Sequence, residues 1–253
     1  MAAADVSTRK TELIEYKDEG TGKVFEAFIA RDASKTGHSP VVLIFHTYAG
    51  RTQFEESKAH LLADMGYVGF AADMYGKGIR GSNPEENTAL LKPLMDDRTD
   101  SLLTRLKLAV ETARKLPYVD PSKVAAIGYC FGGLCCLDIA RNLVDPTQTL
   151  LGVVSLHGIL SKADTDKSSG KILSKVLALH GYADPMVQPD KVVAFGQEMT
   201  DRGADWQLHA YGGVYHAFTN PKANDEKRGA KYNADADRRS WEATRYFLRE
   251  CLS

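Results

Sequence analysis

Short apolar runs alternate with stretches of helical spacing along nearly the whole sequence, and this alternation limits the possible folds more than any other feature. Residues 41–46 are β-branched and apolar on both faces, as strands inside a parallel sheet are. A helical stretch at about 53–65 follows, and the same order then repeats. Strand and helix in alternation predict a mostly parallel sheet with helices on both faces. Because we find no internal repeat or dividing linker, we expect one α/β domain over residues 1–253.

The same patterns predict the individual elements. The expected strands are 11–17 and 24–30, paired as a hairpin, then 41–46, 67–72, 124–127, 150–156, 174–179 and 204–211. The expected helices are 53–65, 97–116, 133–143, 189–201 and 235–251, the last with Trp241, Thr244, Phe247 and Leu248 facing inward. Residues 76–97 begin with several glycines and predict a loop or partial lid, and 219–232 predict a charged loop.

Residues 128–132 read Gly-Tyr-Cys-Phe-Gly, between the apolar run 124–127 and a helical stretch. A nucleophile on a sharp strand-to-helix turn sits in strained backbone, which requires small residues two positions before and after it. Gly128 and Gly132 meet this requirement around Cys130. The turn also places the Cys130 sulfur at a helix N-terminus, where the dipole favours a thiolate. The alternative is a buried structural cysteine before an ordinary helix.

Two further residues follow Cys130 in the order nucleophile, acid, histidine that α/β-hydrolase sheets use. Asp184 comes after the strand 174–179, and His216 lies in the glycine-containing stretch 212–218. A thiol nucleophile needs a base within hydrogen-bond reach and a third group that orients the base. The alternatives are that Asp184 only forms a turn before Pro185 and that His216 is a surface or packing histidine.

His46, His157 and His180 also follow strands, and we expect them to anchor loops by hydrogen bonds. None of the histidines has a His-x-x-x-His or Cys/His spacing that would hold zinc. We therefore expect no metal and no cofactor.

The charge balance and the cysteines restrict the setting. A formal net charge of −1 and a pI near 6.7 give no electrostatic reason to bind nucleic acid or an anionic membrane. No segment approaches the ~20 apolar residues that span a bilayer, and residues 1–7 lack the pattern of a secretory signal. The cysteines other than Cys130 are read as small core residues rather than a disulfide framework, so we expect a cytoplasmic protein.

The sequence resembles the dienelactone hydrolase (carboxymethylenebutenolidase) family of α/β-hydrolases over about residues 12–250. The matching motifs are Ala-Asp-Met-Tyr-Gly at 72–76, Gly-Tyr-Cys-Phe-Gly-Gly at 128–133, His-Gly-Tyr-Ala-Asp-Pro at 180–185 and Tyr-His-Ala-Phe-Thr-Asn-Pro at 215–221. The resemblance implies a single α/β-hydrolase domain and a catalytic triad of Cys130, Asp184 and His216. It also implies an oxyanion hole from the backbone N–H groups of Phe131 and Tyr48. We expect weaker substrate contacts from Thr47, Tyr75 and Phe218.

Two positions depart from the family pattern. The type enzyme has a glutamate on the loop after its first central strand, where this chain has Thr47 in His-Thr-Tyr. Cys130 would then depend on His216 alone for its deprotonation. The type enzyme also has an arginine for the substrate carboxylate shortly after its histidine, where this chain has Asn220. Arg80 and Arg98 are the candidate cations on the lid side.

The sequence thus predicts a cysteine-dependent hydrolase that cleaves an ester, a lactone or a related acyl bond through a thioester intermediate. Its partner is a small-molecule ester or lactone, and we expect a monomer or a homodimer. The alternative is a non-catalytic protein on the same fold that binds a small molecule or a partner. A redox thiol protein is the third possibility, although the sequence offers no obvious resolving cysteine.

Overall fold

The computed structural model describes residues 8–253, so the expectation for residues 1–7 lies outside the described part. The chain forms two compact units, Met1–Ala126 and Ile127–Ser253. Their boundary falls inside strand β5 (Val119–Tyr129) and not in a linker. The expectation of a single domain over 1–253 stays a prediction.

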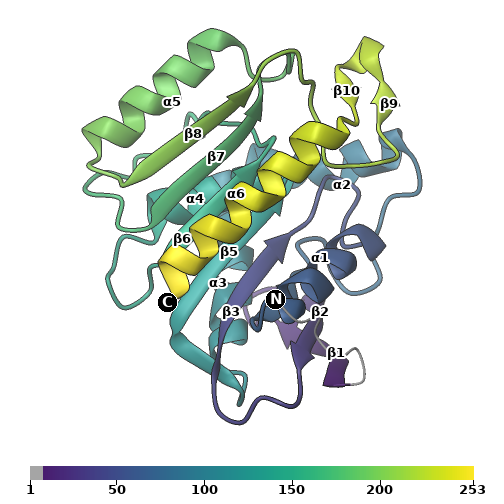
Figure 1. Cartoon of the computed structure of the whole chain (residues 1–253), viewed down its shortest axis with the longest axis vertical. Coiled ribbons are helices and arrows are strands. Elements are labelled where there is room, and N and C mark those ends of the chain that lie inside the picture. The colour runs from purple at the N-terminus through teal and green to yellow at the C-terminus, as the bar shows by residue number, and fades with distance from the viewer. Residues whose placement is uncertain (1–7) are drawn as a thin grey trace. The chain divides into compact units, whose positions relative to one another are not determined.

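The first unit contains an antiparallel hairpin and a parallel pair of strands (Figure 1). Its strands are β1 (Arg9–Lys17), β2 (Val24–Asp32), β3 (Ser39–Phe45), β4 (Val68–Ala71) and the first part of β5, in the order β1-β2-β4-β3-β5. The predicted hairpin is confirmed, since β1 and β2 pair antiparallel along their whole length. β2 pairs antiparallel with β4, and β3 pairs parallel with β4.

Helices α1 (Gln53–Asp64) and α3 (Leu103–Arg114) cover opposite faces of these strands. Gly69 of β4 lies so close to α1 that an added Cβ would stand 2.6 Å from the Ala59 backbone. Gly69 pairs with Ala30 of β2. The guanidinium of Arg105, on α3, lies over the ring of Phe25. Phe25 and Ala30 are an odd number of residues apart on one strand and point to opposite faces, so the two helices do as well.

The prediction for residues 76–97 was only partly right, because α2 (Pro84–Asp96) is a regular helix. The Asn83 side chain accepts a hydrogen bond from the Glu86 N–H, and Pro84 occupies the first turn, so the helix has a good N-terminus. The next predicted helix is also divided, into a π-helical turn (Arg98–Leu102) and α3.

The second unit is parallel and carries the C-terminal half of the chain. Its strands are the end of β5, β6 (Gly152–Leu156), β7 (Lys175–Gly181) and β8 (Trp206–Tyr211), in that order. Its helices are α4 (Phe131–Asn142), α5 (Pro189–Asp201) and α6 (Ala234–Leu252). The predicted charged loop also holds a short hairpin, β9 (Asn224–Asp225) and β10 (Ala230–Lys231), around a 3-10 turn (Glu226–Arg228).

Here too the helices lie on both faces of the strands. A Cβ on Gly152 would meet Cys251 and Phe247 of α6, and Gly133 of α4 lies against Ser155. Gly152 and Ser155 are three residues apart on β6 and therefore face opposite sides. The predicted alternation of strands and helices is thus confirmed in both units.

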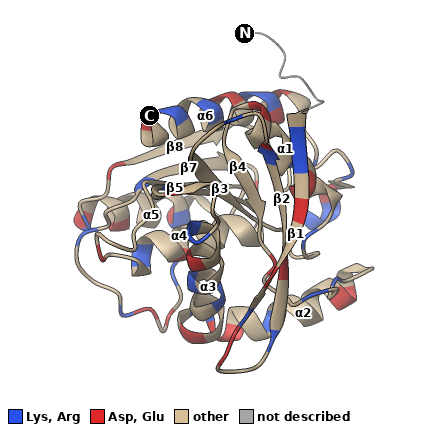
Figure 2. Ribbon diagram, turned by 90° about the horizontal axis from the view of Figure 1, so that it is seen from below, with Lys and Arg blue, Asp and Glu red and all other residues tan. Residues whose placement is uncertain are grey.

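Helix α6 is amphipathic, with one correction to its predicted inner face. Thr244, Phe247 and Leu248 are buried, but Trp241 is only part-buried. Ser240 takes the buried position one residue earlier, so Trp241 lies at the edge of the apolar stripe. In Figure 2, Lys, Arg, Asp and Glu are frequent along α6, whereas the buried strand β4 has none of them. No helix within residues 8–253 is long and apolar enough to cross a bilayer.

A buried ion pair joins α4 and α5 and leads to a stability prediction. Arg141 is fully buried; its Nε and Nη2 donate to the Glu198 carboxylate at 2.9 and 2.7 Å, and Nη2 also donates to the Leu160 carbonyl at 2.6 Å.

Removing one partner of such a pair leaves an uncompensated charge. We expect Arg141→Ala to lower the free energy of unfolding by about 3 kcal/mol in urea denaturation. Arg238→Ala, which removes the exposed pair with Asp235, should change it by less than about 0.5 kcal/mol. Equal effects of the two substitutions would contradict this account.

Candidate active site

Cys130 occupies the sharp turn between β5 and α4 that the sequence predicted. Its backbone has φ 56° and ψ −114°, a conformation that non-glycine residues rarely adopt, and α4 begins at the next residue. A Cβ on Gly128 would stand 2.0 Å from the Gly132 carbonyl oxygen, so only glycine fits two residues before the cysteine. The thiol is part-exposed and is not part of a disulfide. The turn therefore presents Cys130 at the N-terminus of α4, where a thiolate is favoured.

Asp184 lies in the turn that follows β7, and the structure brings it onto His216. The two side chains are 2% and 3% exposed as residues, and the His216 Nδ1 lies 2.7 Å from the Asp184 Oδ2. The other carboxylate oxygen, Oδ1, accepts the Met186 N–H at 2.8 Å. Both oxygens are thus engaged, which fixes the plane of the carboxylate and keeps a proton on the Nδ1 of His216.

The other ring nitrogen of His216 is left for the cysteine. Nε2 is buried and has no oxygen or nitrogen partner among the described residues. Burial by itself lowers the pKa of His216, but the charge and hydrogen bonding of Cys130, together with Asp184, outweigh it and raise this pKa well above its usual value. A raised pKa means that the imidazolium is favoured beside a thiolate. Of the predicted site residues, Cys130, Asp184 and His216 therefore come together in the second unit.

The backbone of His216 is held by the β9–β10 hairpin, which the sequence had not indicated. The His216 N–H donates to the Gly229 carbonyl at 2.9 Å, and the Lys231 N–H donates to the His216 carbonyl at 3.0 Å. Gly229 has φ 72° and packs so tightly that an added Cβ would stand 2.1 Å from Pro185 Cγ. The hairpin thus contacts the loops of both His216 and Asp184.

Gly181 lets the loops of the acid and of the histidine approach each other. A Cβ at this position would stand 2.6 Å from the carbonyl oxygens of Val214 and Tyr215. We expect Gly181→Ala to separate Asp184 from His216 and to lower kcat for ester hydrolysis at least about tenfold, because small misplacements of catalytic groups are costly.

The matched control is Gly212→Ala. Gly212 lies in the same loop region, has an ordinary φ and has no atom within 4 Å of an added Cβ. This variant should hydrolyse esters as the wild type does. If Gly181→Ala retained full kcat, the close approach of the two loops would not matter for the reaction.

His46 and His157 anchor loops, as predicted, whereas the prediction for His180 was wrong. In the first unit His46 accepts the Met74 N–H at 3.1 Å and contacts the Thr47 carbonyl at 2.6 Å. In the second, His157 accepts the Cys130 N–H at 3.1 Å and contacts the Thr219 hydroxyl at 2.8 Å. His180 is buried, and neither of its ring nitrogens finds a partner among the described residues. Its position on β7 turns the ring into the interior, where burial lowers its pKa.

Phe218 is fully buried against the rings of His157 and Tyr211, with centroid distances of 5.0 and 5.5 Å. Phe218 thus packs in the interior, two residues after His216. Its predicted contact with substrate stays a prediction.

In the first unit, Tyr48, Thr47 and Tyr75 lie in neighbouring loops. The Tyr75 hydroxyl donates to the Tyr48 carbonyl at 2.9 Å, so this buried phenol fixes the Tyr48 peptide. The Glu55 carboxylate accepts the Thr47 N–H at 3.2 Å and the Thr52 N–H at 2.8 Å. Glu55 was missed as a residue of this loop, although Thr-x-x-Glu before a helix is a capping-box signature. Tyr48 as an oxyanion donor and Thr47 and Tyr75 as substrate contacts stay predictions.

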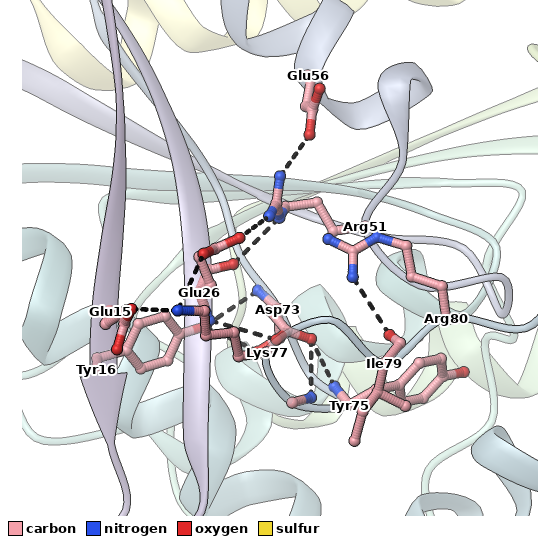
Figure 3. Close-up of polar contacts among 11 residues, drawn as sticks. Glu15, Tyr16, Glu26, Arg51, Glu56, Asp73, Tyr75, Lys77, Ile79 and Arg80 are labelled. Carbon is pink, nitrogen blue, oxygen red and sulfur yellow. Dashed lines mark hydrogen bonds and ion pairs between the residues drawn. The ribbon is translucent and has the colours of Figure 1, made fainter.

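Figure 3 shows the polar cluster beneath these loops. The Asp73 Oδ1 accepts the N–H groups of Tyr75 and Gly76 at 2.9 and 3.0 Å, and the Tyr16 hydroxyl donates to the Asp73 carbonyl at 2.8 Å. Arg51 is buried and pairs with Glu26 at 2.8 Å and also with Glu56. The motif 72–76 therefore has a clear structural task, the anchoring of the loop that carries Tyr75.

The two proposed lid-side cations differ in their surroundings. Arg80 is half-buried, and its Nη1 approaches the Ile79 carbonyl at 3.4 Å (Figure 3). Arg98 is buried in the π-helical turn. A substrate contact by either arginine stays a prediction. Within residues 8–253, no cluster of His, Cys, Asp and Glu is suited to hold a metal ion.

Comparisons with known proteins point in one direction. The profile of the dienelactone hydrolase family matches residues 25–252. The crystal structure of a dienelactone hydrolase-like promiscuous phosphotriesterase from metagenomic libraries superposes with a TM-score of 0.89 at 31% identity, covering 97% of this chain and all of that one. A putative carboxymethylenebutenolidase of Aquifex aeolicus is 27% identical over 84% of this chain and 89% of its own. A putative dienelactone hydrolase of Klebsiella pneumoniae, at 21% identity and a TM-score of 0.73, shares the fold. The resemblance and the fold class predicted from the sequence are confirmed.

Proposed function

Because the chain belongs to the dienelactone hydrolase family and is thereby a hydrolase of carboxylic esters or lactones, we propose that Cys130, Asp184 and His216 carry out the cleavage. The observation that carries this proposal is the pair of buried side chains Asp184 and His216, 2.7 Å apart, with the second ring nitrogen left for the cysteine. The reaction proceeds through a thioester.

In the first half of the reaction, the Cys130 sulfur attacks the acyl carbon after its proton has passed to the Nε2 of His216. Asp184 holds the imidazole in the correct tautomer and stabilises its positive charge. The tetrahedral intermediate then collapses, the leaving oxygen takes the proton from His216, and the acyl group stays on sulfur. In the second half, His216 removes a proton from water as the water attacks the thioester. The C–S bond then breaks, the carboxylic acid is released, and Cys130 is left as a thiolate beside the protonated His216.

The oxyanion of the tetrahedral intermediate needs backbone donors near Cys130. The Cys130 N–H already donates to the Leu156 carbonyl at 3.0 Å and to the Nδ1 of His157 at 3.1 Å. The next N–H in the chain, that of Phe131, opens α4 and benefits from the positive end of the helix dipole. Phe131 is therefore the donor that we propose, and such a donor is worth about 3 kcal/mol in well-studied hydrolases.

We propose a neutral ester or lactone as the substrate class. The type enzyme of the family has a carboxylate-binding arginine shortly after its histidine. At that position this chain has Asn220. Its Oδ1 accepts the Lys222 N–H at 3.0 Å, so this side chain is engaged in its own turn and offers no cation to a substrate.

The test is a panel of p-nitrophenyl esters assayed beside dienelactone, which carries a carboxylate. We expect kcat/KM for the best neutral ester to exceed that for dienelactone at least about tenfold, the effect of one missing charged contact. A preference for dienelactone would contradict the proposed substrate class. If wild type hydrolysed no ester or lactone, the non-catalytic binding protein would become the better description, although such a protein would have no need of the triad.

The similarity to a promiscuous phosphotriesterase at 31% identity over nearly the full length favours a second activity. In it, the Cys130 thiolate would attack phosphorus, a bond to sulfur would form, and an aryloxide would leave. Release of p-nitrophenol from paraoxon, compared in wild type and Cys130→Ala, tests this activity. A single burst without turnover would mean that the phosphorylated enzyme is not hydrolysed. Cytoplasmic location and a monomeric or homodimeric state stay predictions.

A further inference from the structure

The geometry points to a second histidine in the reaction: we propose that His157, oriented by Thr219, is a positioning residue that holds the Cys130 nucleophile in its reactive conformation. This inference rests on the proposed function, because it concerns the same cysteine. His157 contacts the backbone N–H of Cys130. It acts through the backbone of Cys130.

The hydrogen bonds of His157 determine its tautomer. A backbone N–H can only donate, so the Nδ1 that accepts the Cys130 N–H at 3.1 Å must carry a lone pair. The proton then sits on Nε2, which donates it to the Thr219 hydroxyl at 2.8 Å. A ring that is protonated on both nitrogens could not make this pair of bonds. The Cys130 N–H thus fixes the neutral tautomer, and the hydroxyl of Thr219, which is 1% exposed, accepts from it and holds the ring in place.

The surroundings of His157 are those of a residue that is locked in place. It is 1% exposed and has φ 40°, so its own backbone is strained as well. Its ring lies edge-on to His216 at a centroid distance of 5.1 Å and to Phe218 at 5.0 Å. A protonated His216 next to it disfavours a second positive charge, which keeps His157 neutral while the thiolate is formed.

The strained turn explains why Cys130 needs this support. A non-glycine residue at φ 56° persists only where the surrounding structure holds it. The bonds from the Cys130 N–H to His157 and to Leu156 supply such restraint. Without the His157 acceptor, we expect the turn to relax and the sulfur to move away from the Nε2 of His216, so less thiolate is formed.

The experiment uses two matched pairs of variants. His157→Asn keeps an acceptor oxygen at the place of Nδ1 and tolerates a positive φ, whereas His157→Ala has no acceptor. Thr219→Ser keeps the hydroxyl, whereas Thr219→Val removes it at nearly constant volume. The readouts are the rate of alkylation of Cys130 by iodoacetamide at neutral pH, followed on its peptide by mass spectrometry, and kcat and KM for a p-nitrophenyl ester. Circular dichroism checks the fold.

We expect His157→Ala and Thr219→Val to slow both alkylation and kcat about tenfold, with KM nearly unchanged, as for the loss of one buried hydrogen bond. His157→Asn and Thr219→Ser should keep most of the rate. Equal losses in all four folded variants, or a wild-type alkylation rate in His157→Ala, would overturn the proposal. Alkylation needs no ester chemistry. Failure of the proposed function, shown by ester turnover in Cys130→Ala, is therefore distinguishable from failure of this inference.

Discussion

Replacing Cys130 by alanine is expected to lower kcat for p-nitrophenyl esters by about 10⁴-fold or more, as removal of the nucleophile does in other triad hydrolases. The reason is geometric as well as chemical. In our proposal the strained turn presents the Cys130 sulfur, the start of α4 favours its thiolate, and the Nε2 of His216 accepts its proton. Without this atom no thioester forms, and only binding and oxyanion stabilisation remain. Initial rates with wild type and variant at equal concentrations measure the effect.

Cys251→Ala is the matched control. Cys251 is also a part-exposed cysteine outside any disulfide, but it lies near the end of α6, and burial raises its pKa to about 12. This variant should hydrolyse esters at the wild-type rate. If both variants kept their activity, the reaction would use neither of these two thiols. A loss in Cys251→Ala alone would assign the reaction to a different part of the chain.

Asp184→Asn is expected to lower kcat about 10³-fold or more while the fold is retained, because the wrong tautomer of the histidine becomes favoured. The carboxylate accepts the Nδ1 proton of His216 at 2.7 Å, which leaves the lone pair of Nε2 toward Cys130. An amide can donate to Nδ1 instead, and Nε2 would then carry the proton and could not accept another. The pKa of His216 should fall as well, since Asp184 is one of the groups that raise it.

The control for the acid is Asp190→Asn, at the start of α5. Asp190 is exposed and pairs only weakly with Lys191, at 3.5 Å. Its substitution should leave kcat unchanged, and thermal melting should show both variants folded. An Asp184→Asn enzyme with wild-type kcat would remove Asp184 from the mechanism, whereas a loss of fold would show a structural role.

Much of the site could be predicted because it follows strands. The apolar run before Gly128, the small residues around Cys130 and the order of Asp184 and His216 are local or sequential features. They identified the residues that the structure brings together. The same few residues also predict a helix after Cys130, although its predicted start at 133 lies two residues after the observed start at Phe131.

Features that depend on distant segments could not be predicted in this way. The capping-box pattern predicts that Glu55 accepts the Thr52 N–H, but only the folded loop shows that its carboxylate also accepts the Thr47 N–H. His180 resembles His46 and His157 in the sequence, yet only its surroundings decide that its ring nitrogens lack partners. The short hairpin β9–β10, which hydrogen-bonds to the backbone of His216, has two-residue strands that are too short to produce a periodic pattern.

The most direct test of the central claim is to trap the acyl-enzyme. Wild-type protein is mixed with p-nitrophenyl acetate, quenched in acid during turnover, digested and analysed by mass spectrometry. Our account predicts one acetyl group on the peptide that contains Cys130, released by neutral hydroxylamine as a thioester is. Acetylation of a different residue that turns over with the substrate, or turnover after Cys130 has been fully alkylated, would contradict it.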